Sequence, residues 1–167
     1  KDELPELKIK SIKSGKKVFD WKIPSEWNIE KAYVLDNKNN KIIDFKKNNL
    51  HLVNYSIPIN KKIKKKELLS RLHVNKKLPN AIPYITSYYK KYWGFCCSYN
   101  QKKDIKKSYE ANDTFRVVID SSFKKNGRLN YGEIVIPGKS KQEILISTYV
   151  CHPSMANNEL SGPIVSM

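Results

Sequence analysis

Apolar and polar residues alternate over several short stretches in the first third of the chain, and this alternation predicts β-strands. The predicted strands are residues 7–12, 18–24, 31–35, 41–45 and 50–55. Turn-forming residues separate them: Ser14 and Gly15 follow the first strand, Pro24 closes the second, and residues 36–40 divide the third from the fourth. The third and fourth strands are therefore predicted to form a hairpin.

The middle of the chain changes its hydrophobic period. Residues 61–73 carry Ile63, Leu68, Leu69 and Leu72 among many lysines, a spacing that fits one amphipathic helix with the lysines on its wet face. An aromatic stretch follows, comprising Tyr84, Tyr88, Tyr89, Tyr92, Trp93 and Phe95. Such rings can stack on bases or sugars, but packing in a core is the favoured interpretation because aromatic side chains are large and apolar.

The last third predicts three more strands, at residues 113–120, 129–136 and 144–150. Polar turns at residues 124–127 and 137–143 separate them. The last predicted strand is almost continuously apolar, which is typical of a strand covered on both faces in an α/β protein.

The composition is that of a chain that can bury a core, since 40% of its 167 residues are hydrophobic. No apolar run approaches the roughly 18 residues that span a bilayer, and the start of the sequence has no signal-peptide pattern. Three cysteines without a Cys-x-x-Cys pair predict neither a disulfide framework nor a zinc ribbon. We therefore expect a cytoplasmic protein with reduced thiols and no membrane partner.

A formal net charge of +16 raises the question of a nucleic-acid partner. Only three of the 32 basic residues are arginine, the residue that forks onto phosphates and guanine edges. The lysines are spread over every segment, as expected of a solvated surface. No specific nucleic-acid partner is predicted.

Candidate chemistry follows the last predicted strand. His152 lies at the carboxyl end of that strand, where open α/β sheets place their ligands. Asn158 and Glu159 come shortly afterwards, before a predicted helix that opens at Ser161 and Gly162. A histidine nitrogen and a carboxylate oxygen are ligands that catalytic zinc accepts. By spacing alone, however, a histidine at a strand end is more often a hydrogen-bonded structural residue.

A wider set of motifs resembles a known family. The motifs are Val18-Phe-Asp-Trp21, Pro24-x-Glu-Trp-Asn28, Leu50-His-x-Val-x-Tyr-Ser-Ile-Pro58, Ile82-Pro-Tyr-x-Thr-Ser-Tyr-Tyr89, Trp93-Gly-Phe-Cys96, and Tyr131-Gly-Glu-x-x-Ile-Pro-Gly-Lys-Ser140 through Ser161-Gly162. Together they resemble the aminopeptidase-like domain proteins of the domain-of-unknown-function 4910 and 2172 families, which are often labelled polysaccharide-biosynthesis proteins. The stretch from the last strand to the helix also resembles the zinc-binding region of bacterial leucyl aminopeptidase-like metallopeptidases.

The resemblance implies an α/β fold with a zinc-aminopeptidase-like mixed sheet. In this interpretation residues 1–17 start the peptidase-like domain, and residues 18–92 form a small inserted β-rich domain. Residues 93–167 continue the peptidase-like domain, which would extend beyond Met167.

The resemblance also assigns a metal site. It places the first zinc-binding histidine at His152 and the bridging aspartate at Asn158, with Glu159 next to it. Either Glu159 takes over as the carboxylate ligand, or the site holds one metal, or it is catalytically impaired. Ser154 stands where those peptidases keep a ligand-orienting aspartate. The general base and the remaining ligands are expected beyond Met167, so no catalytic residue is assigned and the chain alone is expected to be inactive.

The expected function is zinc-dependent hydrolysis of an amide, at a peptide N-terminus or at an N-acyl group of a sugar precursor. The alternative is a non-catalytic binding module that has kept a degenerate peptidase fold, because a neutral amide at Asn158 bridges two cations poorly. His51 and His73 are interpreted as structural residues. Association into a homo-oligomer is left open.

Overall fold

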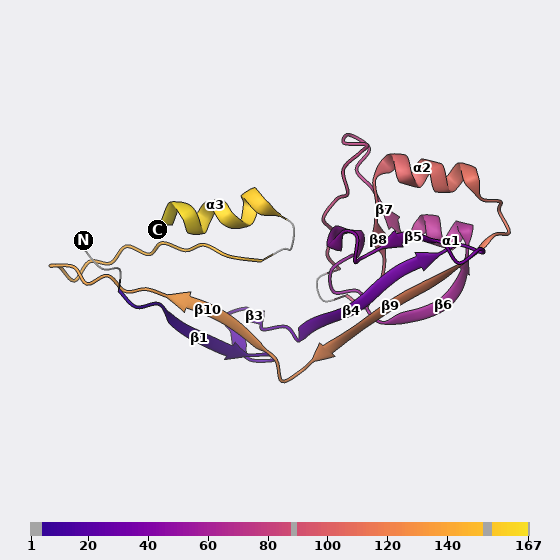
Figure 1. Cartoon of the computed structure of the whole chain (residues 1–167). Coiled ribbons are helices and arrows are strands. Elements are labelled where there is room, and N and C mark those ends of the chain that lie inside the picture. The colour runs from indigo at the N-terminus through magenta and orange to yellow at the C-terminus, as the bar shows by residue number, and fades with distance from the viewer. Residues whose placement is uncertain (1–4, 88–89, 152–154, 167) are drawn as a thin grey trace. The chain divides into compact units, whose positions relative to one another are not determined.

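A computed structural model describes residues 5–87, 90–151 and 155–166 and divides the chain into two compact units (Figure 1). One unit is the continuous segment Trp27–Phe123, and the other combines Lys1–Glu26 with Lys124–Met167. Helices and several small sheets occur together, so the fold is mixed α/β, as predicted at that level.

The unit Trp27–Phe123 is built on a four-stranded sheet with the strand order β5-β4-β9-β6. Its strands are β4 (Glu26–Leu35), β5 (Lys41–Asp44), β6 (Ile59–Lys64) and β9 (Thr114–Lys124). The strands β4 and β5 pair antiparallel, which confirms the hairpin predicted for residues 31–45. The pairing of β6 with β9 is also antiparallel and sets Ile63 opposite Phe115.

Shorter elements complete this unit. They are the 3₁₀-helix η1 (Asn49–His51), the helices α1 (Lys65–Ser70) and α2 (Tyr99–Ser108), and the parallel strands β7 (Leu72–His73) and β8 (Phe95–Cys96). The Oγ atom of Ser98 accepts the backbone N–H of Gln101 at 3.0 Å and so caps the start of α2. The sequence analysis did not predict α2.

The hydrophobic core of the protein belongs to this unit. Its members come from both sheets and both helices and include Val34, Leu68, Phe95, Ile105 and Phe115, each at most 4% exposed. Trp93 is 5% exposed and belongs to the same cluster, so this part of the aromatic stretch packs in the core, as predicted. Tyr88 and Tyr89 lie outside the described residues.

The prediction of one helix over residues 61–73 is wrong. Those residues form the end of β6, the short helix α1 and the strand β7. Ile63, Leu68 and Leu72 do reach the core, but from three different elements. The cause is long-range pairing of β6 with β9, which a helical pattern of spacing does not report.

The strand predicted for residues 50–55 is also wrong. The side chain of Asn48 accepts the N–H of Leu50 at 2.9 Å and starts the 3₁₀ turn η1 instead. Leu52 then makes an isolated bridge to Phe95, and Tyr55 adopts a left-handed backbone with φ of 64°. Local side-chain bonding to the backbone therefore prevails over strand propensity here.

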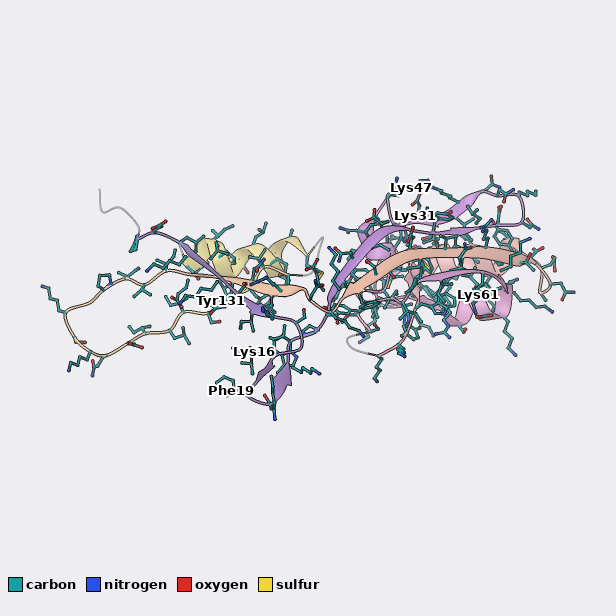
Figure 2. All side chains as sticks on the ribbon, turned by 90° about the horizontal axis from the view of Figure 1, so that it is seen from below. Lys16, Phe19, Lys31, Lys47, Lys61 and Tyr131 are labelled. Carbon is teal, nitrogen blue, oxygen red and sulfur yellow. The ribbon has the colours of Figure 1, made fainter. Side chains whose placement is uncertain are left out.

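The second unit contains two small sheets. The antiparallel strands β1 (Lys8–Lys13) and β10 (Arg128–Glu133) pair with Ile12 opposite Leu129. The predicted strand 18–24 is instead a tight hairpin of β2 (Lys17–Val18) and β3 (Trp21–Lys22). Phe19 lies in its turn with φ of 53° and is 94% exposed (Figure 2).

The predicted strand at residues 144–150 is absent from the described structure. Residues 134–151 form no helix or strand, and Ile144 and Leu145 are 92% and 90% exposed. The physical reason is that no described strand runs beside this segment to accept its backbone hydrogen bonds. A helix does follow, but α3 (Ala156–Ser166) begins five residues before the predicted start at Ser161, so Asn158 and Glu159 lie within the helix and not before it.

The limits of the compact units differ from the predicted domain limits. The unit Trp27–Phe123 starts later and ends later than the predicted insertion 18–92, because β9 pairs with β6 inside the same sheet. Whether this unit is an insertion in a peptidase-like domain stays a prediction. Within the described ranges, no helix is long and apolar enough to cross a membrane.

Candidate functional site

Two of the predicted metal ligands, Asn158 and Glu159, lie on α3, and the segment that ends at Cys151 belongs to the same unit as this helix. Residues 148–151 lie against the helix: the Oγ1 atom of Thr148 is only 2.0 Å from the position that a Cβ atom on Gly162 would occupy. Glycine is therefore required where the helix meets this segment. This contact explains why the second residue of the Ser161-Gly162 motif is glycine.

Glu159 is the buried acid of α3, with 6% of its surface exposed. Its Oε2 atom accepts the backbone N–H of Cys151 at 2.5 Å. The Oε1 atom is buried and has no hydrogen-bond partner within the described ranges. A buried carboxylate oxygen without a partner is costly, so this atom is a free acceptor for a cation or a proton donor.

Asn158 is exposed, and its Oδ1 atom accepts a hydrogen bond from the hydroxyl of Tyr149 at 3.3 Å. Consecutive helical residues point about 100° apart, which separates this amide from the buried side chain of Glu159. The structure thus places the two predicted ligands next to different partners. His152 lies outside the described residues.

One donor of this site suits a zinc ion: the Oε1 atom of Glu159 on α3 is a buried carboxylate oxygen without a hydrogen-bond partner in the described ranges. Across residues 5–87, 90–151 and 155–166, no group of three His, Cys, Asp or Glu side chains comes together. Of the predicted ligands, the described residues therefore supply the carboxylate of Glu159 and the amide of Asn158, which have different partners.

Cys151 is a further group of this site to which the sequence analysis gave no role. The pKa of its thiol is raised, first by partial removal from water. The negative charge of Glu159 and a hydrogen bond with that side chain raise it further. The thiol therefore remains protonated at neutral pH, which makes it a weak nucleophile. The sequence signal was its position directly before His152.

The two histidines of the other unit have structural partners, as predicted. Nδ1 of His51 lies 2.8 Å from the carbonyl oxygen of Cys96, and Nε2 of His73 lies 2.8 Å from the hydroxyl of Tyr92. Burial, followed by the charges of Lys102 and Arg71, lowers the pKa of His73.

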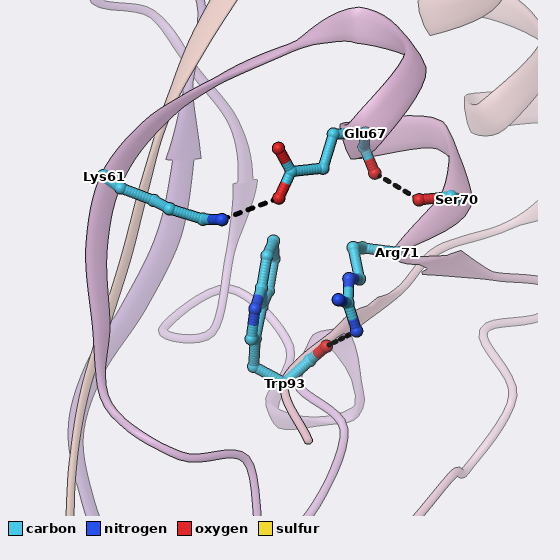
Figure 3. Close-up of polar contacts among 5 residues, drawn as sticks. All are labelled: Lys61, Glu67, Ser70, Arg71 and Trp93. Atoms are coloured by element: carbon cyan, nitrogen blue, oxygen red, sulfur yellow. Dashed lines mark hydrogen bonds and ion pairs between the residues drawn. The ribbon is translucent and has the colours of Figure 1, made fainter. Parts of the chain in front are cut away.

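Basic residues of the unit Trp27–Phe123 make internal contacts around α1 (Figure 3). The Nζ atom of Lys61 lies 2.7 Å from a carboxylate oxygen of Glu67. The guanidinium of Arg71 lies over the rings of Trp93 and Tyr92, at 4.8 and 5.0 Å from their centroids. These contacts therefore stabilise the unit.

The charge itself is concentrated in this unit. It holds 20 of the 32 basic and 8 of the 16 acidic residues, a net charge of +12 out of +16.

The sequence is similar to one described protein family and to a relative from a bacterium. A family model described as "Domain of unknown function (DUF2172)" matches residues 26–122. A protein of Clostridium acetobutylicum described as "Putative polysaccharide biosynthesis protein with aminopeptidase-like domain" is 49% identical over 156 residues, which cover 93% of this chain and 35% of the relative.

The fold is similar to that of a solved structure. The crystal structure of a "putative peptidase" from Clostridium acetobutylicum matches with a TM-score of 0.83 and 48% identity, over 95% of this chain and 36% of that chain. The chain therefore spans about a third of the length of the proteins it matches here.

Proposed function

Since this chain belongs to the DUF2172 family, we propose that it forms part of an aminopeptidase-like hydrolase that cleaves an amide bond with the help of zinc. The description of the relative as aminopeptidase-like and that of the solved structure as a peptidase support this class of reaction. The substrate we propose is a peptide N-terminus or an N-acyl group of a glycan precursor. The glycan assignment draws on the polysaccharide biosynthesis named for the relative.

One observation carries the proposal: the Oε1 atom of Glu159 is buried and has no hydrogen-bond partner in the described ranges. We propose that this oxygen is a zinc ligand. His152 would add a nitrogen, and Asn158 would add an amide oxygen if its Oδ1 atom left the hydroxyl of Tyr149 and turned toward Glu159. Zinc, when bound, would lower the pKa of a water and polarise the amide carbonyl of the substrate.

The second oxygen of Glu159 has a positioning role in this proposal. It holds the backbone N–H of Cys151 at 2.5 Å and so fixes the chain directly before His152. Hydrogen bonds that orient the surroundings of a ligand are a general feature of metal sites. Glu159 would thus bind with one oxygen and orient the chain with the other.

Metal analysis of three variants tests the site. Glu159→Gln keeps the size of the side chain and an oxygen that can accept the Cys151 N–H, but removes the charge. Glu143→Gln is the matched control, because Glu143 is an exposed carboxylate of the same unit. After removal of metal and dialysis against zinc, we expect at least tenfold weaker binding for Glu159→Gln and His152→Ala, and unchanged binding for Glu143→Gln. Equal zinc affinity in all forms would refute the ligand assignment.

A binding module without catalysis is the second candidate function. It is favoured by the neutral side chain of Asn158, which is exposed and turned toward Tyr149 instead of sharing the surroundings of Glu159. A protein with the length of the relative should then bind aminoacyl or N-acetyl-sugar amides without turnover. Release of free amine from either substrate class would decide for the hydrolase.

A further inference from the structure

The four-stranded sheet of the unit Trp27–Phe123 has the helices α1 and α2 on one face (Figure 1). Ile63 of β6 and Phe115 of β9 lie opposite each other and belong to the core to which both helices contribute. Because successive strand residues point to opposite faces, the neighbours of Ile63 and Phe115 in β6 and β9 point away from this core. The second face of the sheet therefore presents its own set of side chains.

Three cations, which we call the basic row, lie together on this second face. They are Lys62 and Lys64 of the edge strand β6 and Arg116 of the neighbouring strand β9. Two residues along a strand are about 6.7 Å apart, which sets the spacing of Lys62 and Lys64. Arg116 lies directly opposite Lys62 in the pairing of the two strands. All three residues are exposed, so a ligand can reach them from solvent.

The basic row sets like charges against each other. Like charges directly opposite across two strands destabilise a sheet, and Lys62 and Arg116 are such a pair. The guanidinium of Arg116 donates to Oδ1 of Asn60 at 3.4 Å, and this neutral amide does not cancel its charge. Within residues 5–87, 90–151 and 155–166, no ion pair involves a residue of the basic row. A bound anion would remove the repulsion.

The acidic residues of β9 and of the turn before it have other partners. Asp120 forms an ion pair with Lys31 at 3.6 Å. Asp113 accepts a hydrogen bond from the side-chain amide of Asn37 at 3.1 Å and another from the backbone N–H of Glu110 at 2.7 Å. These contacts engage Asp120 and Asp113 away from the basic row, which therefore keeps its positive charge.

A row of separate positive charges is complementary to a polymer with separate anionic groups. The unit carries a net charge of +12, which attracts such a polymer from a distance. Single-stranded nucleic acid also needs aromatic rings on which its bases stack. Tyr33 of the same sheet already carries the Nζ atom of Lys41 over its ring, at 4.9 Å from the centroid. A sugar chain with carboxylate or phosphate groups can bind through point charges, which lysine supplies.

We propose that the basic row binds the anionic groups of an acidic sugar chain, with Arg116, Lys62 and Lys64 in contact with successive carboxylates or phosphates. The choice of a sugar chain rests on the proposed function, in which a glycan precursor is a substrate. The anion site itself rests on the charges of the sheet. In this arrangement the unit Trp27–Phe123 holds the polymer, and Glu159 of the other unit serves the reaction.

Binding of labelled sugar chains to the whole protein chain, followed by fluorescence anisotropy, tests the ligand. The probes are an oligomer of galacturonic acid for carboxylate, a phosphomannan oligomer for phosphate, and an unsubstituted galactan oligomer of equal length as the neutral control. We expect one or both charged oligomers to bind, and the neutral one not to bind. Binding of neither charged oligomer would overturn the proposal. Tighter binding of single-stranded DNA of equal charge would overturn the choice of a sugar chain.

Variants of equal net charge test the location of the site. Replacing all three residues of the basic row by glutamine should weaken binding about tenfold, as expected for the loss of three exposed charge pairs. The matched control replaces Lys47, Lys76 and Lys77, which are exposed lysines of the same unit, by glutamine. Its affinity should change less than about twofold, because these lysines do not belong to the row. Equal affinities of the two triple variants would refute the assignment.

Lys62→Glu separates the loss of binding from a loss of folding. A glutamate opposite Arg116 replaces the repulsion by an attraction, so the urea midpoint of unfolding should equal or exceed that of the unchanged chain. Affinity for the charged oligomer should nevertheless fall about tenfold, and more than in the control Lys47→Glu. The same loss of affinity in both glutamate variants would refute the proposal. Zinc binding should stay unchanged in every variant of the row, so this site and the zinc site of Glu159 can fail separately.

Discussion

Replacing Leu68 by alanine is expected to destabilise the unit Trp27–Phe123 strongly. Leu68 is 0% exposed in α1 and belongs to the core. The change removes three carbon atoms, which at about 0.8 kcal/mol for each buried CH₂ group amounts to roughly 2.4 kcal/mol. The cavity left behind raises the loss in unfolding free energy to about 3 kcal/mol. The slightly higher helix propensity of alanine offsets only a few tenths of this loss.

Urea unfolding followed by tryptophan fluorescence measures this effect, because Trp27 and Trp93 both belong to the unit. With a slope of about 1.5 kcal/mol per M, the midpoint of Leu68→Ala should fall by about 2 M. Leu78→Ala is the matched control, since Leu78 is 59% exposed, and its unfolding free energy should change by less than about 0.5 kcal/mol. Equal midpoints for the two variants would show that this unit is not stabilised by the core assigned to it.

Three further predictions concern single sites. Burial raises the pKa of Cys96 to about 12 and that of Cys97 to about 11, so at pH 8 only the exposed Cys151 thiol of the folded chain should react with Ellman's reagent, and all three thiols after unfolding. Because the pKa of Cys151 is raised as well, its reaction in the folded chain should be slower than that of a free thiol. Burial and nearby cations lower the pKa of His73 below its usual 6.5, so the unfolded state binds this proton more readily. Stability should therefore fall as the pH drops below about 6.5, and the pH dependence of the unfolding free energy should weaken in His73→Gln. Gly162→Ala should increase hydrogen exchange across α3, because the new Cβ atom would lie 2.0 Å from Thr148 Oγ1; adding Thr148→Ala should restore protection, since it removes that atom.

Local patterns predicted those parts of the fold in which neighbours in sequence are also neighbours in space. The hairpin of β4 and β5 is an example, since the turn between the strands contains Asp36, whose carboxylate accepts the N–H groups of Lys38 and Asn40 at 2.8 Å each. The turn at Gly15, with φ of 85°, was predicted for the same reason. Turn chemistry is encoded within a few residues and can be recognised without knowledge of the rest of the chain.

Prediction failed where distant contacts decide the structure. Residues 59–64 become a strand because β9, 50 to 60 residues further along the chain, pairs with them. Helix α2 has only Ile105 fully buried, so its apolar face was too narrow to be noticed in the sequence. Residues 144–150 have the composition of an inner strand, yet composition cannot supply the neighbouring strands that would make them one.

The candidate site was predictable only in part. The motif around Gly162 located α3 and both of its candidate ligands. It did not show that one oxygen of Glu159 is occupied by the Cys151 N–H, or that Asn158 and Glu159 have different partners. Those features depend on side-chain direction, which differs by about 100° between consecutive helical positions.

Because β4 lies beside β9, the chain enters and leaves the unit Trp27–Phe123 on neighbouring strands. The chain enters the unit Trp27–Phe123 along β4 and leaves it along β9, and these strands are neighbours in one sheet. At this point the ring of Tyr55 lies 6.0 Å from that of Trp27 and 6.1 Å from that of Phe123. Glu26 and Lys124, the residues just outside, form an ion pair of 3.5 Å. A segment whose entrance and exit meet in this way can be deleted, replaced or transplanted as a cassette by a single short splice.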